Sequence, residues 1–348
     1  MHHGKPLENL LKGFGETVPT ELICPACVGE LEQRASYYCL RCKRTYPIVA
    51  GIADLRLWPD RYLTLHEDRR KAEKIASYEG SALDLVDAYW SMTPEVPTAL
   101  ARLYRGAAQR SIERGVAILD RLGPLPESAT LLDVGCGTGG LVVAAAKRGA
   151  DAVGIDVALR WLVVCARLAQ DEGVAASFVA ADGAVPPFRQ HSFDAVTCVE
   201  TLEHAADPQG TLQNALRLSK DRFLAVTFNR FSLAPDPTLR LMLPGLLPHR
   251  IRTRYVQARR GTGSANYAPL SLAQLQTWLG PAPIGRRAEV LVRAGRLPPV
   301  GSGGSWVRRF GTAVHDRVVA GPLEQMLRPI APMLEISQLD RESTILTA

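Results

Sequence analysis

The stretch from Leu131 to Gly140 constrains the fold of this chain more than any other, because it joins an apolar run to a cluster of glycines. The run ends in Asp133 and the glycines follow at once; Leu141 to Ala146 is then apolar and suits a helix. Glycine allows a tight turn and leaves no Cβ between the backbone and a ligand, while the start of a helix offers free N–H groups. Strand, glycine turn and helix together predict the first unit of a nucleotide-binding α/β sheet.

Three further apolar runs follow, and each is predicted to be a strand with a polar residue at its end. The run 152–156 ends in Asp156, which is well placed for a ribose diol. The run 177–181 leads into Asp182 and Gly183, and the run 193–199 leads into Glu200 to His204. The glycines alone also satisfy the dinucleotide fingerprint G-x-G-x-x-G, so a Rossmann-like dehydrogenase and an inactive relative are the competing interpretations.

The complete ordered series resembles the class I S-adenosylmethionine-dependent methyltransferases, and within them the relatives of the ubiquinone/menaquinone C-methyltransferases. Its five marks are D-V-G-C-G-T-G from Asp133, G-I-D ending at Asp156, D-G at Asp182, F-D-x-V from Phe193, and E-H ending at His204. The resemblance implies an α/β fold, with a doubly wound seven-stranded Rossmann-like methyltransferase sheet. It also implies that S-adenosylmethionine is the methyl donor.

The resemblance carries a role to each matching residue on the methionine and ribose side of the cofactor. Gly135, Cys136 and Gly137 would let the backbone approach the methionine and ribose portions. Asp133 would orient the methionine ammonium, directly or through water, and Asp156 would accept hydrogen bonds from both ribose hydroxyls.

The remaining carried-over roles concern the adenine and the transferred methyl group. Val157 would flank the adenine, Asp182 would accept a hydrogen bond from its amino group, and Gly183 would donate through its backbone. Glu200 and Leu202 would border the methyl-transfer channel.

A catalytic base and an acceptor site have weaker signals. His204 follows the fourth strand and is the first candidate for a base, which oxygen acceptors often need; a histidine that only orients its loop explains the position equally well. Asn229 and Arg230 could bind an anionic or carbonyl group of an acceptor or could fix the strand end, and Tyr255 lies in a basic stretch after them.

Near the N-terminus, two C-x2-C pairs form a candidate metal site. Cys24 and Cys27 are followed by Cys39 and Cys42. Two such knuckles facing each other make a closed tetrahedral site that suits zinc in a structural role, because no position is left for a catalytic water. Two disulfides or four free thiols are the alternatives; a disulfide framework is not expected in a chain that we predict to be cytoplasmic.

The residues after the second knuckle extend this pattern. Tyr-Pro-Ile at 46–48 and Gly51-Ile52 with Leu55 resemble a family of small zinc-ribbon domains, some of which are activator subunits of methyltransferases and others of which are fused to the enzyme. The resemblance implies that the ribbon supports the catalytic domain or contributes to substrate binding.

We therefore divide the chain into four parts: a tail at 1–20, a zinc ribbon at 21–57, a helical linker or cap at 58–125, and a methyltransferase domain at 126–342 with a helical lid. Lid insertions are expected at about 231–269 and 297–331 by resemblance to substrate lids in this fold. Within the cap, one helix is expected around 66–74 and another over 99–122. Its aromatic residues, Tyr78, Tyr89, Trp90 and Tyr104, could cover the cofactor or simply pack between helices.

Composition narrows the function without choosing the acceptor. No apolar run approaches the length of a membrane span, and the formal net charge of +6 mildly favours anionic partners.

The first hypothesis is methyl transfer to a small-molecule acceptor: a metabolite, a lipid-linked compound or a natural product. The alternatives are an RNA methyltransferase, since a zinc ribbon on this fold also resembles ribosomal-RNA guanine methyltransferases, and a non-catalytic binding module. The sequence leaves the oligomeric state open.

Overall fold

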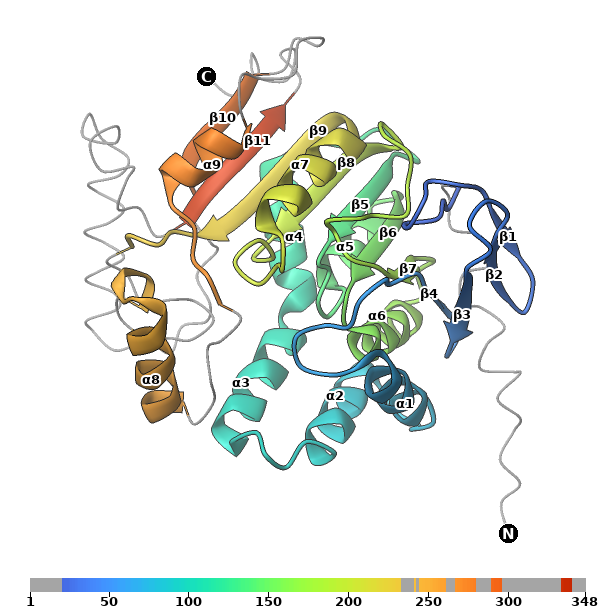
Figure 1. The fold of residues 1–348 in the computed structure, drawn as a ribbon, viewed down its shortest axis with the longest axis horizontal. Helices are drawn as coiled ribbons and strands as arrows, with labels where there is room; N and C mark the ends of the chain where they lie inside the picture. Colours follow the sequence, from blue (N-terminus) through green and yellow to red (C-terminus); the bar gives the residue numbers. More distant parts are fainter. Residues whose placement is uncertain are drawn as a thin grey trace. The chain divides into compact units, whose positions relative to one another are not determined.

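The computed structural model describes residues 21–232, 241, 244–260, 267–279, 289–295 and 333–339. These residues form two compact units, and Figure 1 labels their helices and strands. Unit 1 holds the described residues up to 197 together with 214–220, and unit 2 holds 198–213 and the described residues from 221 onward. The predicted tail at 1–20 and the predicted insertion at 297–331 lie outside the described residues.

The N-terminal part of unit 1 is a small antiparallel sheet, which we call the ribbon (residues 21–57). Its strands are β1 (Leu31–Gln33), β2 (Ser36–Cys39), β3 (Thr45–Val49) and β4 (Ile52–Asp54). The last of them pairs in parallel with β7 (Ser177–Ala180), with Ala53 opposite Val179 and Asp54 opposite Ala180. The ribbon thereby extends the main sheet of unit 1, as the blue strands beside β7 show in Figure 1.

The main sheet of unit 1 is parallel. It contains β7 together with β5 (Thr130–Val134), β6 (Asp151–Asp156) and β8 (Phe193–Val199), in the order β4-β7-β6-β5-β8. Helices α5 (Gly140–Lys147) and α6 (Leu159–Asp171) make the connections. Leu131 and Val153 are fully buried, as expected for parallel strands covered on both faces.

Four helices precede the main sheet: α1 (Leu65–Ala76), α2 (Ala82–Ser91), α3 (Thr98–Gln109) and α4 (Ser111–Leu122). The prediction of one helix over 99–122 is wrong, because the backbone leaves helical geometry at Arg110 (φ −104°, ψ 10°). The break lets α4 lie very close to α5: a Cβ on Gly115 would be 2.6 Å from the Leu141 Cα. Helix α2 was not predicted, although Ser81 and Asp84 form a capping box at its start.

The strands that lie mainly in unit 2 are β9 (Ser219–Phe228), β10 (Glu289–Gly295) and β11 (Met333–Leu339). They are antiparallel in the order β9-β11-β10. The helical elements are α7 (Pro208–Leu218), η2 (Pro244–Leu246), α8 (His249–Arg260) and α9 (Leu272–Leu279). Helix α8 occupies the basic stretch, which was not predicted to be helical.

The predicted fold class is confirmed. Within the described residues after 126 there are seven strands, β5 to β11, and helices separate β5 from β6, β6 from β7, β8 from β9 and β9 from β10. Among the helices in the described part of the chain, none combines the length and the hydropathy needed to cross a bilayer.

Candidate functional site

The glycine turn after β5 has the backbone geometry that its composition predicts. Gly137 and Gly139 have φ angles of +55° and +78°, in the left-handed region that side chains disfavour. A Cβ on Gly139 would lie 2.8 Å from the Cβ of Cys165 on α6, whereas a Cβ on Gly137 would have no atom within 4 Å. Gly139 is therefore needed for packing, and Gly137 leaves open space at the sheet edge.

Asp156 ties the end of β6 to the glycine turn. Its Oδ2 accepts a hydrogen bond from the Gly137 N–H at 3.0 Å, and its Oδ1 accepts one from the Ala158 N–H at 2.8 Å. Burial raises the pKa of Asp156, and these two backbone donors lower it in part. The carboxylate is thus held in a fixed orientation beside the turn.

Asp133 lies at the end of β5 and is 4% exposed. Its Oδ1 accepts a hydrogen bond from the Thr197 hydroxyl of β8 at 2.8 Å. Burial raises the pKa of Asp133 to about 7, against the lowering effect of Thr197 and with a further rise from the charge of Asp156. A cation placed beside Asp133 would favour its ionised form.

The third acid of the series, Asp182, follows β7. Its Oδ1 accepts a hydrogen bond from the Ala184 N–H at 2.9 Å, which fixes the turn that contains Gly183. Because β5, β6 and β7 are neighbouring parallel strands, their carboxyl ends meet at one edge of the sheet. The structure therefore brings the predicted residues of unit 1 to one edge: Asp133, Gly135, Cys136, Gly137, Asp156, Val157, Asp182 and Gly183.

Glu200, Leu202 and His204 lie in unit 2, in the loop after β8. Glu200 has a φ of +53°, and its N–H donates to the Val226 carbonyl at 2.7 Å. Leu202 is buried. The His204 ring packs against that of Tyr267, with ring centroids 5.3 Å apart. Tyr267 had no sequence signal, because it follows a stretch that resembles a turn.

The acceptor candidates lie at two places in unit 2. Asn229 is fully buried and pairs with Leu270 in an isolated parallel bridge, and the Arg230 N–H donates to the Leu270 carbonyl at 2.7 Å. Tyr255 is half-buried on α8. These backbone contacts hold the 229–230 segment at the strand end, and the acceptor roles of the Asn229 and Arg230 side chains stay predictions.

The four cysteines of the ribbon converge. Their Sγ atoms all lie within 4.8 Å of one another, with Cys24 and Cys42 3.6 Å apart and Cys27 and Cys39 3.5 Å apart. Four sulfurs at about 2.3 Å from a tetrahedral zinc ion would be about 3.8 Å from one another. All seven cysteines of the chain are free thiols. The donor set therefore fits zinc and does not form the alternative disulfides.

The surroundings of the cysteines also suit thiolates. The Cys42 N–H donates to the Cys39 Sγ at 3.4 Å, and the Tyr46 hydroxyl lies 3.1 Å from the Cys24 Sγ. Although burial raises the pKa of Cys39, hydrogen bonds from backbone N–H groups and neighbouring thiols lower it to about 6. The Arg44 backbone lowers the pKa of Cys42, but burial and the neighbouring cysteines raise it to about 12, so without a cation the cluster favours a thiolate at Cys39 and a thiol at Cys42. The residue after each knuckle, Val28 or Lys43, has a φ near +60° (61° and 62°), so the two knuckles share one geometry.

Two groups of side chains form by contacts between segments that are far apart in the chain. The first is an aromatic cluster: Tyr89, Trp90 and Tyr104 pack together with Trp161 of α6, at centroid distances of 4.7 to 5.9 Å. The second is a buried set of aspartate–arginine pairs that includes Arg56 and Asp68. Tyr89, Trp90 and Tyr104 were among the aromatic cap candidates, and their rings pack between α2, α3 and α6. Trp161 and the aspartate–arginine pairs were missed, because their partners are distant in the sequence.

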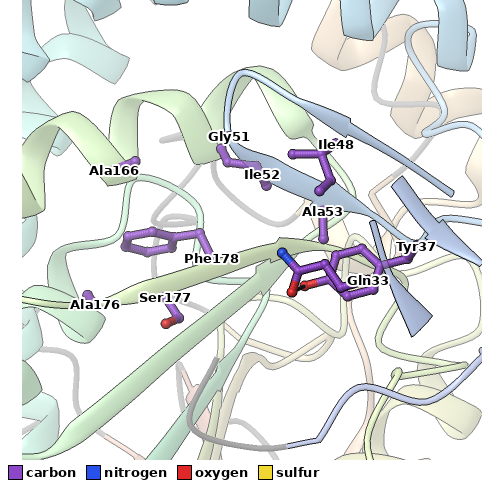
Figure 2. Close-up of a pocket in the computed structure, with 10 residues that line it drawn as sticks. All are labelled: Gln33, Tyr37, Ile48, Gly51, Ile52, Ala53, Ala166, Ala176, Ser177 and Phe178. Atoms are coloured by element: carbon purple, nitrogen blue, oxygen red, sulfur yellow. Dashed lines mark hydrogen bonds between the residues drawn. The ribbon is translucent and has the colours of Figure 1, made fainter. Parts of the chain in front are cut away.

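A small pocket lies between the ribbon and the main sheet, away from the predicted site residues at the carboxyl edge of the sheet. Figure 2 shows Gln33 and Tyr37 from the ribbon on one side and Ala176, Ser177 and Phe178 on the other. Ser177 begins β7, whereas Asp182 follows its opposite end. None of the predicted site residues lines this pocket, so it is distinct from the candidate site at the carboxyl edge.

The comparisons with known proteins concern the same part of the chain. Residues 132–222 match the family described as a methyltransferase domain. The ubiquinone biosynthesis O-methyltransferase of Paracidovorax citrulli is 40% identical over 105 residues, which are 29% of this chain and 43% of that protein. The enzyme of the same name from Coxiella burnetii is 28% identical over 158 residues, 45% of this chain and 62% of that protein. The chain therefore spans less than two thirds of either relative.

Two solved structures are similar at low identity. Phosphoethanolamine N-methyltransferase 2 of Haemonchus contortus has 17% identity and a TM-score of 0.42, over 66% of this chain and 52% of that chain. Magnesium protoporphyrin IX methyltransferase of Synechocystis PCC 6803 has 15% identity and a TM-score of 0.40, over 68% of this chain and 84% of that chain.

The family match begins within β5 and ends within β9, so it includes the glycine turn and the acids at 133, 156 and 182. The resemblance to the class I S-adenosylmethionine-dependent methyltransferases, carried by the sequence motifs, is therefore confirmed over residues 132–222.

Proposed function

We propose that this chain is an S-adenosylmethionine-dependent methyltransferase that acts on a small-molecule acceptor. The observation that supports this most directly is the row of Asp133, Asp156 and Asp182 around the glycine turn, at the carboxyl ends of three adjacent parallel strands. This edge is where open α/β sheets bind nucleotides. The family match to residues 132–222 supports the same conclusion.

Asp156 and Asp133 hold the polar ends of the ribose and methionine portions. The Asp156 carboxylate accepts the two ribose hydroxyls, since its orientation is fixed by the N–H groups of Gly137 and Ala158. Asp133 faces the methionine ammonium, whose charge lowers the raised pKa of this buried acid. The open space at Gly137 admits the ligand next to the backbone.

Val157 flanks the adenine, while Asp182 and the backbone of Gly183 recognise its edge. Asp182 is suited to this because the turn that it caps is fixed by the Ala184 N–H. Glu200 and Leu202 border the methyl-transfer channel.

When bound, S-adenosylmethionine supplies a methyl group on a positively charged sulfur, which is already an activated leaving group. The chain must therefore hold the acceptor in line and exclude water. For an oxygen acceptor, His204 would take the proton, and its packing against Tyr267 fixes its ring plane. Oxygen is the acceptor atom that the names of the curated relatives suggest. Asn229, Arg230 and Tyr255 are the candidates for acceptor contacts.

We also propose that Cys24, Cys27, Cys39 and Cys42 hold one structural zinc ion. The sulfur distances fit a tetrahedral site, and four cysteine ligands leave no open position for catalysis.

The first test is calorimetric titration with S-adenosylmethionine and S-adenosylhomocysteine. Asp156→Asn is expected to weaken both about tenfold or more, since it removes charged hydrogen bonds to the ribose. Asp151→Asn is the matched control, because Asp151 begins the same strand and is exposed at its other end. The control should bind as the wild type does. A folded wild-type protein that binds neither ligand would overturn the proposal.

RNA methylation is the second candidate, and one feature favours it. Helix α8 has five arginines and no acidic residue, and Arg250, Arg254 and Arg259 are exposed on it. Transfer of labelled methyl groups to phenolic small molecules and, in parallel, to RNA would separate the two. Labelling of RNA alone, with steep salt dependence, would replace the first candidate by the second.

A further inference from the structure

A buried network of three aspartates and three arginines connects the ribbon to the cofactor edge. The Arg56 guanidinium forms two hydrogen bonds to the Asp54 carboxylate, at 2.7 and 2.8 Å, and a third to Asp68 at 2.5 Å. Arg69 also donates to Asp54, and Arg160 bridges Asp68 and Asp60. The six formal charges cancel, and the side chains of all members except Arg69 are at most 5% exposed.

This network ends on the backbone that follows Asp156. Arg56 Nη1 also donates to the Val157 carbonyl at 2.6 Å, and Asp68 Oδ2 accepts the Leu159 N–H at 2.9 Å. The residue at the N-cap of α6, Ala158, has no side-chain cap of its own. Asp68 therefore supplies, from α1, the carboxylate that the first turn of α6 lacks.

Both contacts restrain one short loop from two sides. The loop begins at Asp156, whose carboxylate is held by Gly137, and continues through Val157 to the start of α6. With the Val157 carbonyl and the Leu159 N–H both fixed, the loop cannot turn its acid away from the glycine turn. A guanidinium suits this position because its planar donors reach two acids and a carbonyl at once.

We propose that Arg56 and Asp68 are positioning residues that hold Asp156 and Val157 in place for the ribose and adenine of S-adenosylmethionine. This inference rests on the proposed function. The C-terminal end of the ribbon would then act through the hydrogen bond from Arg56 to the Val157 carbonyl and not through the cysteine site.

The test compares two ligands that differ in one hydroxyl, S-adenosylhomocysteine and its 2′-deoxy analogue, by calorimetry. Arg56→Lys keeps the charge but cannot form all four contacts. We expect it to weaken S-adenosylhomocysteine about tenfold and to bring the ratio of the two dissociation constants towards one, because Asp156 no longer faces the diol. Loss of folded protein alone would weaken both ligands equally and leave that ratio unchanged.

Arg69→Lys is the matched control, since Arg69 contacts Asp54 but not the loop; both dissociation constants should match those of the wild type. If Arg56→Lys does not fold, Asp68→Asn is measured in the same way, with the same expected change in ratio. If the wild type binds S-adenosylhomocysteine and the variant keeps the wild-type ratio of the two dissociation constants, this inference is refuted and the proposed function is not. No binding by the wild type would refute the proposed function as well.

Discussion

Two groups of buried aspartates in unit 1 differ in what balances their charge. Asp54 and Asp68 each contact arginines. Burial raises the pKa of Asp54, but the contacts with the guanidinium groups lower it further, to below its usual value. Asp133 and Asp156 form no ion pair with any residue that the structure describes, and burial raises the pKa of both. Burying a carboxylate without a cation costs free energy.

The difference separates a scaffold from a ligand site. The first group is paired with arginines of the chain and fixes backbone. The raised pKa values of the second group mean that burial disfavours its charge, and an external cation, such as the proposed ammonium of the methionine portion, would favour the ionised form. The four sulfurs of the ribbon belong with the second group, because their thiolates also need an external cation. Perturbed and unbalanced acids of this kind are concentrated at functional sites.

Removing the proposed zinc ion should have the largest effect on stability. Without a cation the four sulfurs lose what holds them together, so the ribbon is expected to unfold and the melting temperature to fall by more than about 10 °C. Calorimetric melting with a strong chelator, followed by addition of zinc or of magnesium as a control, measures this. If the purified protein contains no zinc and the chelator does not change its melting temperature, the four cysteines do not hold a structural cation.

Removing one aspartate of the arginine-paired group should have the second-largest effect on stability. Asp54→Ala leaves the buried Arg56 guanidinium with two of its four hydrogen bonds, and breaking a buried ion pair typically costs about 3–5 kcal/mol of unfolding free energy. Urea denaturation followed by circular dichroism measures the loss. Asp87→Ala removes the exposed partner of Arg105 and should change the stability little, because exposed pairs are screened by solvent. Equal losses in the two variants would show that burial of the network adds nothing.

Asp133→Asn should have a smaller effect, of opposite sign. With a folded pKa of about 7, Asp133 keeps in the folded state a proton that the unfolded chain has already released, so its contribution to stability falls as pH rises towards 7. The asparagine variant cannot ionise, so it does not lose stability in this way. At about pH 8 its free energy of unfolding should exceed that of the wild type by roughly 2–4 kcal/mol. It should also bind S-adenosylhomocysteine more weakly. Parallel stability–pH curves for the two proteins would contradict the raised pKa.

Much of unit 1 could be predicted from its sequence. The strand over 193–199 begins and ends as expected, Asp156 ends β6 as predicted, and Asp182 follows β7. These predictions succeeded because a glycine turn, an apolar run and a terminal acid are local properties, encoded within a few residues.

Predictions that depended on distant contacts did less well. The break at Arg110 reflects the close packing of Gly115 against α5, which the helical periodicity of 99–122 does not reveal. Helix α8 was missed because its composition is dominated by arginine, so the apolar pattern that marks a helix is weak.

The sequence by itself determined the α/β class, the position of the glycine turn, the acids at the ends of the strands and the two cysteine pairs, since each is marked by residue type and spacing. Only the tertiary structure decided which charges are neutralised. Arg56 and Asp68 read in the sequence as ordinary surface charges, and pairing with each other and with the 157–159 backbone makes them part of the scaffold. The physical reason is that a charge becomes costly only when burial removes water, and burial is a property of the folded chain.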